Sequence, residues 1–284
     1  MKTDLLPSLN WDIRTESVKI SSMFDTGKKA IIRTDNNHIL SIVGKDYCPV
    51  SNAQLMSFTT ALTETGEFEL KGFDEINDGK TILAFLQNKN PNLKINGCAM
   101  KEYMFVGNTH DGTKALTIGT ANNLVRCSNQ FYSTLKVYRK KHTSPFVFNQ
   151  IEIQDIIRSY KVKKSQVYGV FDGMESVRVD QGVINRLVVE IHKMLETDSS
   201  ISKKENLGWS PSMQLLRKSI DKEMKDIGNN AFGLFNGVTW YTSHEMRNAE
   251  SVSGRISGTA NQINQKAYRF CNNLKRASNN MAIL

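Results

Sequence analysis

The sequence predicts an α+β protein, with an N-terminal antiparallel sheet in hairpin-helix-hairpin order and a mainly helical C-terminal region. Three observations support this prediction. Short β-rich runs dominate the first half of the chain, and apolar residues at three- and four-residue spacing dominate after about residue 150. The composition, 39% hydrophobic and 23% charged in 284 residues, is that of a globular protein. We therefore expect a mixed α/β sheet domain at residues 1–150 and a helical region at residues 151–284.

The predicted strands of the first half form three pairs. They are residues 29–34 with 38–43, residues 67–73 with 81–87, and residues 103–107 with 115–119. Each pair is separated by a stretch rich in Asn, Asp, Gly or Thr, which are residues that turns favour. A short helix is expected at residues 122–134, and a further extended segment at residues 135–141.

A helix is expected between the first two hairpins. Leu55, Phe58 and Leu62 recur at helical spacing and therefore fall on one face. Either Ser51 or Asn52 stands where a side-chain oxygen would cap the helix N-terminus.

Five helices are expected after residue 150. They are residues 151–160, 181–195, 211–228, 230–247 and 259–276. Asp180 is placed to cap the second of them, and Pro211 suits the first turn of the third. The Ser- and Lys-rich segment 196–212 is the expected loop boundary within this region.

Positive charge is concentrated in two blocks. The formal net charge of the chain is +9, yet residues 1–100 carry a net charge of −1. Residues 126–164 carry a net charge of +7, and residues 247–276 carry +5. Concentrated positive charge attracts polyanions, so nucleic acid is an expected partner.

Aromatic residues are interleaved with the cations of the first block. A groove that binds single strands combines cations that track phosphates with rings that stack on bases. The alternative is a solvated amphipathic strand whose rings, Phe131, Tyr132, Tyr138, Phe146 and Phe148, face the core. If the groove exists, the predicted nucleic-acid-binding residues are Arg126, Lys136, Tyr138, Arg139, Lys140, Lys141, Lys161, Lys163 and Lys164.

Motifs of the common enzyme classes are absent from the sequence. It contains no GxxxxGK[ST], GxGxxG, HExxH or GxSxG pattern, so we expect no ATP hydrolysis, no cofactor and no catalytic residues. The four cysteines, Cys48, Cys98, Cys127 and Cys271, are far apart and are expected to be free thiols. No signal peptide and no membrane span is recognisable, so the predicted location is the cytoplasm of a bacterial host.

His110 and Asp111 are the best candidates for chemistry. Adjacent His and Asp in a Gly-containing turn suit a metal ligand pair or a general base. The same composition is what a strand-to-strand connection requires. The other histidines add no metal-ligand spacing, so no metal site is predicted and the role of this turn is left open.

Four segments resemble a family of phage/plasmid-like proteins of unknown function. Residues 42–52 resemble its VG..Y.PV.N motif, and residues 108–116 its N.HDGS.A motif. Residues 124–129 and 230–238 are similar to its RVVCQN and TAWGLYNAV motifs. The chain departs from that family in its N-terminal segment and at Ser128. The resemblance implies an origin in a mobile element and no established activity.

These observations favour an ATP-independent nucleic-acid-binding protein of a phage or plasmid. We expect it to bind and anneal single-stranded DNA in recombination or replication, as an oligomer that aligns the strand. The alternative is a phage-encoded interaction protein whose basic surface meets an acidic partner and inhibits a host defence or nucleic-acid enzyme. A third possibility, a metal-dependent nuclease, depends on His110 and Asp111.

Overall fold

The computed structural model describes residue 6 and residues 8–21, 24–91, 94–95, 98–124, 130–195, 209–246 and 258–281. For residues 94–95, 98–99, 121–124, 130–136, 195 and 278–281 it describes the backbone alone. The chain forms two compact units. Unit 1 contains residues 1–91, 101–121 and 134–164, and unit 2 contains residues 92–100, 122–133 and 165–284. Helix α2 (Gln150–Glu175) begins at residue 150 and contributes to both units, which divide within it after residue 164.

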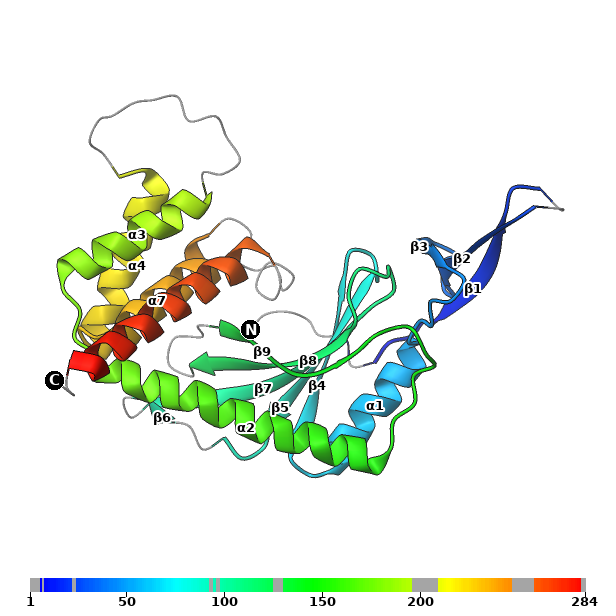
Figure 1. The fold of residues 1–284 in the computed structure, drawn as a ribbon, viewed down its shortest axis with the longest axis horizontal. Coiled ribbons are helices and arrows are strands. Elements are labelled where there is room, and N and C mark those ends of the chain that lie inside the picture. Colours follow the sequence, from blue (N-terminus) through cyan, green and yellow to red (C-terminus); the bar gives the residue numbers. More distant parts are fainter. Residues whose placement is uncertain are drawn as a thin grey trace. The chain divides into compact units, whose positions relative to one another are not determined.

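Unit 1 contains a small antiparallel sheet of three strands. They are β1 (Ile13–Lys19), β2 (Asp25–Arg33) and β3 (Ile39–Gly44), in that order. The predicted pair 29–34 and 38–43 is confirmed as β2 and β3, joined through Asn37 at a φ of 60°. Because the last residue of β3 pairs with Lys28, the β1–β2 hairpin extends beyond β3 (Figure 1).

Helix α1 (Asn52–Glu64) follows the small sheet, as the sequence predicts. Ser51 caps it, because its Oγ accepts a hydrogen bond from the backbone N–H of Gln54 at 3.1 Å. The Gln54 side chain accepts in return from the backbone N–H of Ser51 at 3.0 Å, which completes a capping box. Leu55, Phe58 and Leu62 are fully buried, so the predicted apolar face is the buried face.

The larger sheet confirms the α+β prediction. Its strands are β4 (Phe68–Ile76), β5 (Thr81–Asn88), β6 (Lys94–Ile95), β7 (Cys98–Thr109), β8 (Leu116–Leu124) and β9 (Gln130–Lys140). The order is β4-β5-β7-β8-β9, with β6 paired to β7. The predicted pairs 67–73/81–87 and 103–107/115–119 correspond to β4/β5 and β7/β8.

The short helix expected at residues 122–134 is wrong. Residues 122–124 end β8 and residues 130–134 begin β9, while residues 125–129 lie outside the described residues. The aromatic and β-branched residues Phe131, Tyr132 and Thr134 favour a strand, and pairing within the sheet provides the partner. The extended segment expected at residues 135–141 is confirmed as the second half of β9.

The core of unit 1 lies between one face of the larger sheet and two helices. Helix α1 and the first half of α2 lie along the sheet (Figure 1). Phe58 on α1 and Ile153 on α2 belong to the same buried cluster as Ile82 on β5 and Val106 on β7. This packing positions the ends of the strands and helices. The connections between those ends carry most of the candidate site that is described below.

From residue 165 on, the described part of unit 2 is helical, whereas its residues 92–100 and 122–133 contribute β6 and strand ends to the larger sheet. Besides the end of α2 it contains α3 (Gln181–Leu195), α4 (Pro211–Ile227), α5 (Ala231–Trp240), the π-helical turn η1 (Tyr241–Glu245) and α7 (Thr259–Met281). The backbone N–H of Val183 donates to Asp180 Oδ1 at 2.8 Å, so the predicted cap of α3 is confirmed. The predicted loop boundary 196–212 lies largely outside the described residues.

Helices α4 and α5 approach each other at glycine. A Cβ atom on Gly237 would lie 2.3 Å from Cα of Ile220 on α4, which is closer than real Cβ atoms approach backbone. One turn earlier, a Cβ atom on Gly233 would lie 2.3 Å from the carbonyl oxygen of Gly228. The two backbones are therefore in direct contact along this face of α5.

The structure also bears on membrane spans and on the cysteines. Among the described helices, none combines the length and the apolar character needed to cross a bilayer. Cys48 and Cys271 are free thiols, whereas the side chain of Cys98 and all of Cys127 lie outside the described residues.

Candidate nucleic-acid interface

The basic end of β9 presents different side chains to its two sides. Alternation along the strand places Arg139 opposite Tyr138 and Lys140, and Lys141 is the first residue after the strand. Arg139 and Lys141 are exposed, and within the described part of the chain neither makes an ion pair. Lys140, in contrast, donates from Nζ to the carbonyl oxygen of Val147 at 2.6 Å. Of these three cations, Arg139 and Lys141 are therefore free to bind a polyanion, and Lys140 is not.

Tyr138 is half-buried and is held by contacts with the protein. Its hydroxyl donates to Glu152 Oε1, and burial together with that carboxylate raises the pKa of the phenol. Its ring lies 6.5 Å from the ring of Phe58. The ring centroids of Phe146 and Phe148 lie 5.3 Å and 5.1 Å from that of Phe58, so these two rings of the basic block pack with Tyr138 around one core phenylalanine.

The predicted cations on α2 lie in different surroundings. Lys161 Nζ is 2.6 Å from Glu67 Oε1, in a partly exposed ion pair. Lys164 pairs with Glu102, whose side chain is 0% exposed. Lys163 is half-buried. Of the remaining predicted residues, Arg126 and the side chain of Lys136 lie outside the described residues.

Three connections that are distant in sequence meet at the end of β9. They are the β3–α1, β7–β8 and β9–α2 connections. The backbone N–H of Cys48 donates to the carbonyl oxygen of His142 at 2.7 Å, and the Tyr47 hydroxyl donates to the carbonyl oxygen of Thr109 at 3.0 Å. The rings of Tyr47 and His142 stack with their centroids 4.9 Å apart. These contacts hold the three connections together.

Each connection contributes an exposed lysine. They are Lys45, Lys114 and Lys141, and none of them makes an ion pair in the part of the chain that the structure describes. We call these three lysines and Arg139 the loop cluster. Asp46 and Asp111 lie on the same connections, and the Asp111 carboxylate accepts from the backbone N–H of Thr113 at 3.0 Å. The four cations therefore outnumber the neighbouring carboxylates.

Sequence reasoning did not identify Lys45 and Lys114. Each is a single lysine outside the basic block, so charge counting gives no signal there. Lys45 precedes Lys141 by 96 residues and Lys114 precedes it by 27, and contacts between the three connections bring these segments together.

A buried polar network underlies the loop cluster. His110, Asn52 and Asn108 are each 0% exposed. His110 Nε2 lies 3.0 Å from Asn52 Oδ1, and Asn52 Nδ2 donates to the carbonyl oxygen of Trp11 at 3.1 Å. Because Asn52 Oδ1 can only accept, His110 Nε2 carries the proton. Burial lowers the pKa of His110 to about 4.

The surroundings of His110 therefore favour the turn interpretation of residues 108–113 over a reactive site. The imidazole is neutral, buried and engaged with an amide. Among the described residues, no three His, Cys, Asp or Glu side chains are grouped so that they could hold a metal ion.

Asn52 is expected to stabilise this network measurably. In Asn52→Leu the two hydrogen bonds are lost, and the N–H of His110 and the carbonyl of Trp11 remain buried without partners. We expect the free energy of unfolding to fall by about 2 kcal/mol in urea titrations. Asn90→Leu, at an exposed position, is the matched control and should change it by less than about 0.5 kcal/mol. Equal losses in both variants would contradict the network.

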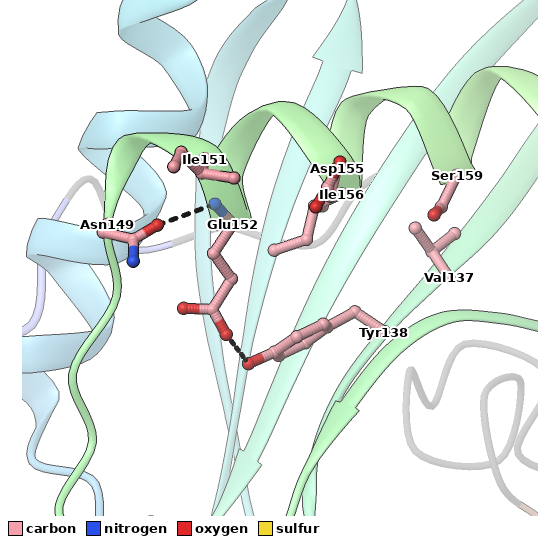
Figure 2. Close-up of a pocket in the computed structure, with 8 residues that line it drawn as sticks. All are labelled: Val137, Tyr138, Asn149, Ile151, Glu152, Asp155, Ile156 and Ser159. Atoms are coloured by element: carbon pink, nitrogen blue, oxygen red, sulfur yellow. Dashed lines mark hydrogen bonds between the residues drawn. The ribbon is translucent and has the colours of Figure 1, made fainter.

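A pocket of about 460 Å³ lies between β9 and the start of α2 (Figure 2). Its lining combines apolar and acidic side chains: Val137, Tyr138, Asn149, Ile151, Glu152, Asp155, Ile156 and Ser159. Asn149 Oδ1 accepts from the backbone N–H of Glu152 at 2.9 Å and so caps α2. Carboxylates repel phosphate, so this pocket does not belong to the proposed contact with nucleic acid.

Comparisons with known proteins place most of the chain in one family. A family model described as "Domain of unknown function (DUF932)" matches residues 39–277. No curated protein and no solved structure matches the chain. The match covers β3 through most of α7.

Proposed function

The chain belongs to the DUF932 family, a domain family of unknown function, and from this premise we propose a function based on its own residues. We propose that it binds nucleic acid without ATP, and single-stranded DNA in particular, through the loop cluster. The observation that carries the proposal is the contact between the three connections that bear Lys45, Lys114 and Lys141; these lysines and Arg139 are exposed, and none is ion-paired in the described residues.

The loop cluster has the properties that capture of a phosphate backbone requires. Cations that neutralise phosphates release counterions and so supply sequence-independent affinity. The hydrogen bonds from Cys48 and Tyr47 hold the three connections in place before binding, so little conformational freedom remains to be lost. Phe131 and Tyr132 precede the cations in the sequence, and aromatic residues beside cations are the composition of sites that bind single strands.

In this mechanism the protein holds a strand by its backbone and leaves the bases open for pairing. Several subunits would align a strand for annealing in recombination or replication. The four motif resemblances support a phage or plasmid origin, and the proposed location is the bacterial cytoplasm.

Reversing charge in the loop cluster tests the proposal. In Arg139→Glu/Lys141→Glu, the affinity for a labelled single-stranded oligonucleotide is expected to fall about tenfold or more, because two phosphate contacts become repulsive. The slope of log affinity against log salt should become shallower by about 0.7 per cation lost. Fluorescence anisotropy over a salt series measures both quantities.

Two controls make the result specific. Lys218→Glu lies at an exposed position of α4 and changes the net charge by the same amount as each substitution in the loop cluster. It should leave the affinity for the oligonucleotide nearly unchanged. Lys45→Glu/Lys114→Glu should weaken binding as much as the β9 variant does, although these residues lie outside the basic block. If both double variants bind like the wild type, the interface is not the loop cluster.

A second candidate is an interaction protein that meets an acidic protein surface. The inward packing of Tyr138, Phe146 and Phe148 favours it, because those rings are occupied in the core. Absence of binding to single- and double-stranded DNA at low salt would reject the first candidate in favour of this one.

A further inference from the structure

The tip of the β1–β2 hairpin exposes apolar side chains. Ile20 is 71% exposed and Phe24 is 62% exposed. The backbone N–H of Ile20 donates to the carbonyl oxygen of Phe24 at 3.0 Å, so the two residues stand opposite each other. The adjacent Lys19 is exposed and makes no ion pair within the described residues. The tip therefore presents an apolar pair beside a free cation.

The pocket between β9 and α2 has the complementary character. Ile151 on its rim is 74% exposed, and the neighbouring Val147 is 68% exposed. Glu152 and Asp155 contribute carboxylates to its lining (Figure 2). A volume of about 460 Å³ lies within the range of pockets that enclose a ligand.

The carboxylates of the pocket retain capacity for a further cation. Glu152 Oε1 accepts from the Tyr138 hydroxyl, which is neutral, and lies 3.9 Å from Lys140 Nζ, which is the long limit of an ion pair. Asp155 is paired with Arg158 at 3.2 Å, but both side chains are more than half exposed and such a pair contributes little. A lysine brought in with apolar neighbours would gain charge pairing and apolar burial together.

We propose that the hairpin tip of one copy of this chain inserts into the pocket of a second copy. The basis is charge complementarity, Lys19 towards Glu152 and Asp155, combined with the exposed apolar residues that both surfaces carry. The contact is heterologous, because two different surfaces of the same chain meet. Such contacts propagate and produce a ring or a filament.

This inference goes beyond nucleic-acid binding and is tested without nucleic acid. Phe24→Asp disables the tip and Ile151→Arg disables the pocket, both at exposed positions where the fold tolerates the change. We expect light scattering to show assemblies for the wild type and a 32.1 kDa monomer for each variant alone. A mixture of the two variants retains one intact tip and one intact pocket, and is expected to form a dimer with twice the monomer mass.

The variants separate a heterologous contact from a symmetric one. If the tips of two copies met each other, Ile151→Arg would still assemble on its own because its tip is intact, and that result would overturn the proposal. A wild type that remains monomeric at about 100 μM would also overturn it. Val162→Asp, another apolar-to-acidic change at a residue 52% exposed, is the control and should assemble like the wild type. Circular dichroism confirms that each variant is folded.

Discussion

Replacing Lys164 with Met is expected to lower the free energy of unfolding by about 3–5 kcal/mol, because it leaves the carboxylate of Glu102 buried without a cation. The Lys164 side chain is 15% exposed and that of Glu102 is 0% exposed. Asn88 Nδ2 donates to Glu102 Oε2 at 2.7 Å, while Glu102 Oε1 has no hydrogen-bond partner in the described structure. One amide does not replace the lost charge. Urea denaturation followed by circular dichroism measures the effect.

A second variant distinguishes this structural role from a contact with DNA. In Lys164→Met/Glu102→Gln the buried charge is removed, while the amide oxygen still accepts from Asn88. Most of the lost stability should return. A Lys164→Met protein that keeps its stability but binds single-stranded DNA more weakly would instead support the sequence prediction that Lys164 contacts nucleic acid.

Stability is expected to fall by about 3 kcal/mol as the pH drops from 6.5 to about 4, through His110 alone. Above pH 6.5 the imidazole is neutral in both the folded and the unfolded chain, so it adds no pH dependence. Between the two values the unfolded chain binds the proton and the folded chain does not, which favours unfolding. Below about pH 4 both states are protonated and the loss is complete.

His110→Gln tests this expectation. The glutamine amide can donate to Asn52 Oδ1 as the imidazole does, but it does not titrate. The difference in unfolding free energy between pH 7 and pH 4 should be smaller than in the wild type by about 3 kcal/mol. Asp12, Asp111, His142 and Arg33 also act on this site, so the comparison with the wild type is essential. Identical pH dependence in both proteins would show that His110 is not buried in its neutral form.

The sequence was most informative where local rules decide the structure. The spacing of Leu55, Phe58 and Leu62 predicted the buried face of α1, and the Asp180 cap of α3 was predicted from its position alone. Strand β1 was not predicted, because Ile13–Lys19 reads IRTESVK and lacks the alternation of a half-buried strand. It is an edge strand paired on one side only, and pairing with β2 rather than its own pattern makes it a strand.

The candidate site was harder to predict, since it depends on contacts between distant segments. Alternation along β9 places Tyr138 and Lys140 on the side opposite to Arg139, but it does not show which side faces the core. Glu152 and Phe58 decide that, by engaging Tyr138. Lys45 belongs to the loop cluster because the β3–α1 connection, on which it lies, contacts the chain at Thr109 and His142.

The backbone contact at Gly237 and Ile220 has a consequence for the motions of unit 2. Side chains that separate helices act as a compliant layer, because rotamer changes let one helix shift over another. Helices α4 and α5 have no such layer where their backbones touch, so neither can rotate or slide without the other. The pair should therefore open as one cooperative block, with its amide hydrogens exchanging together.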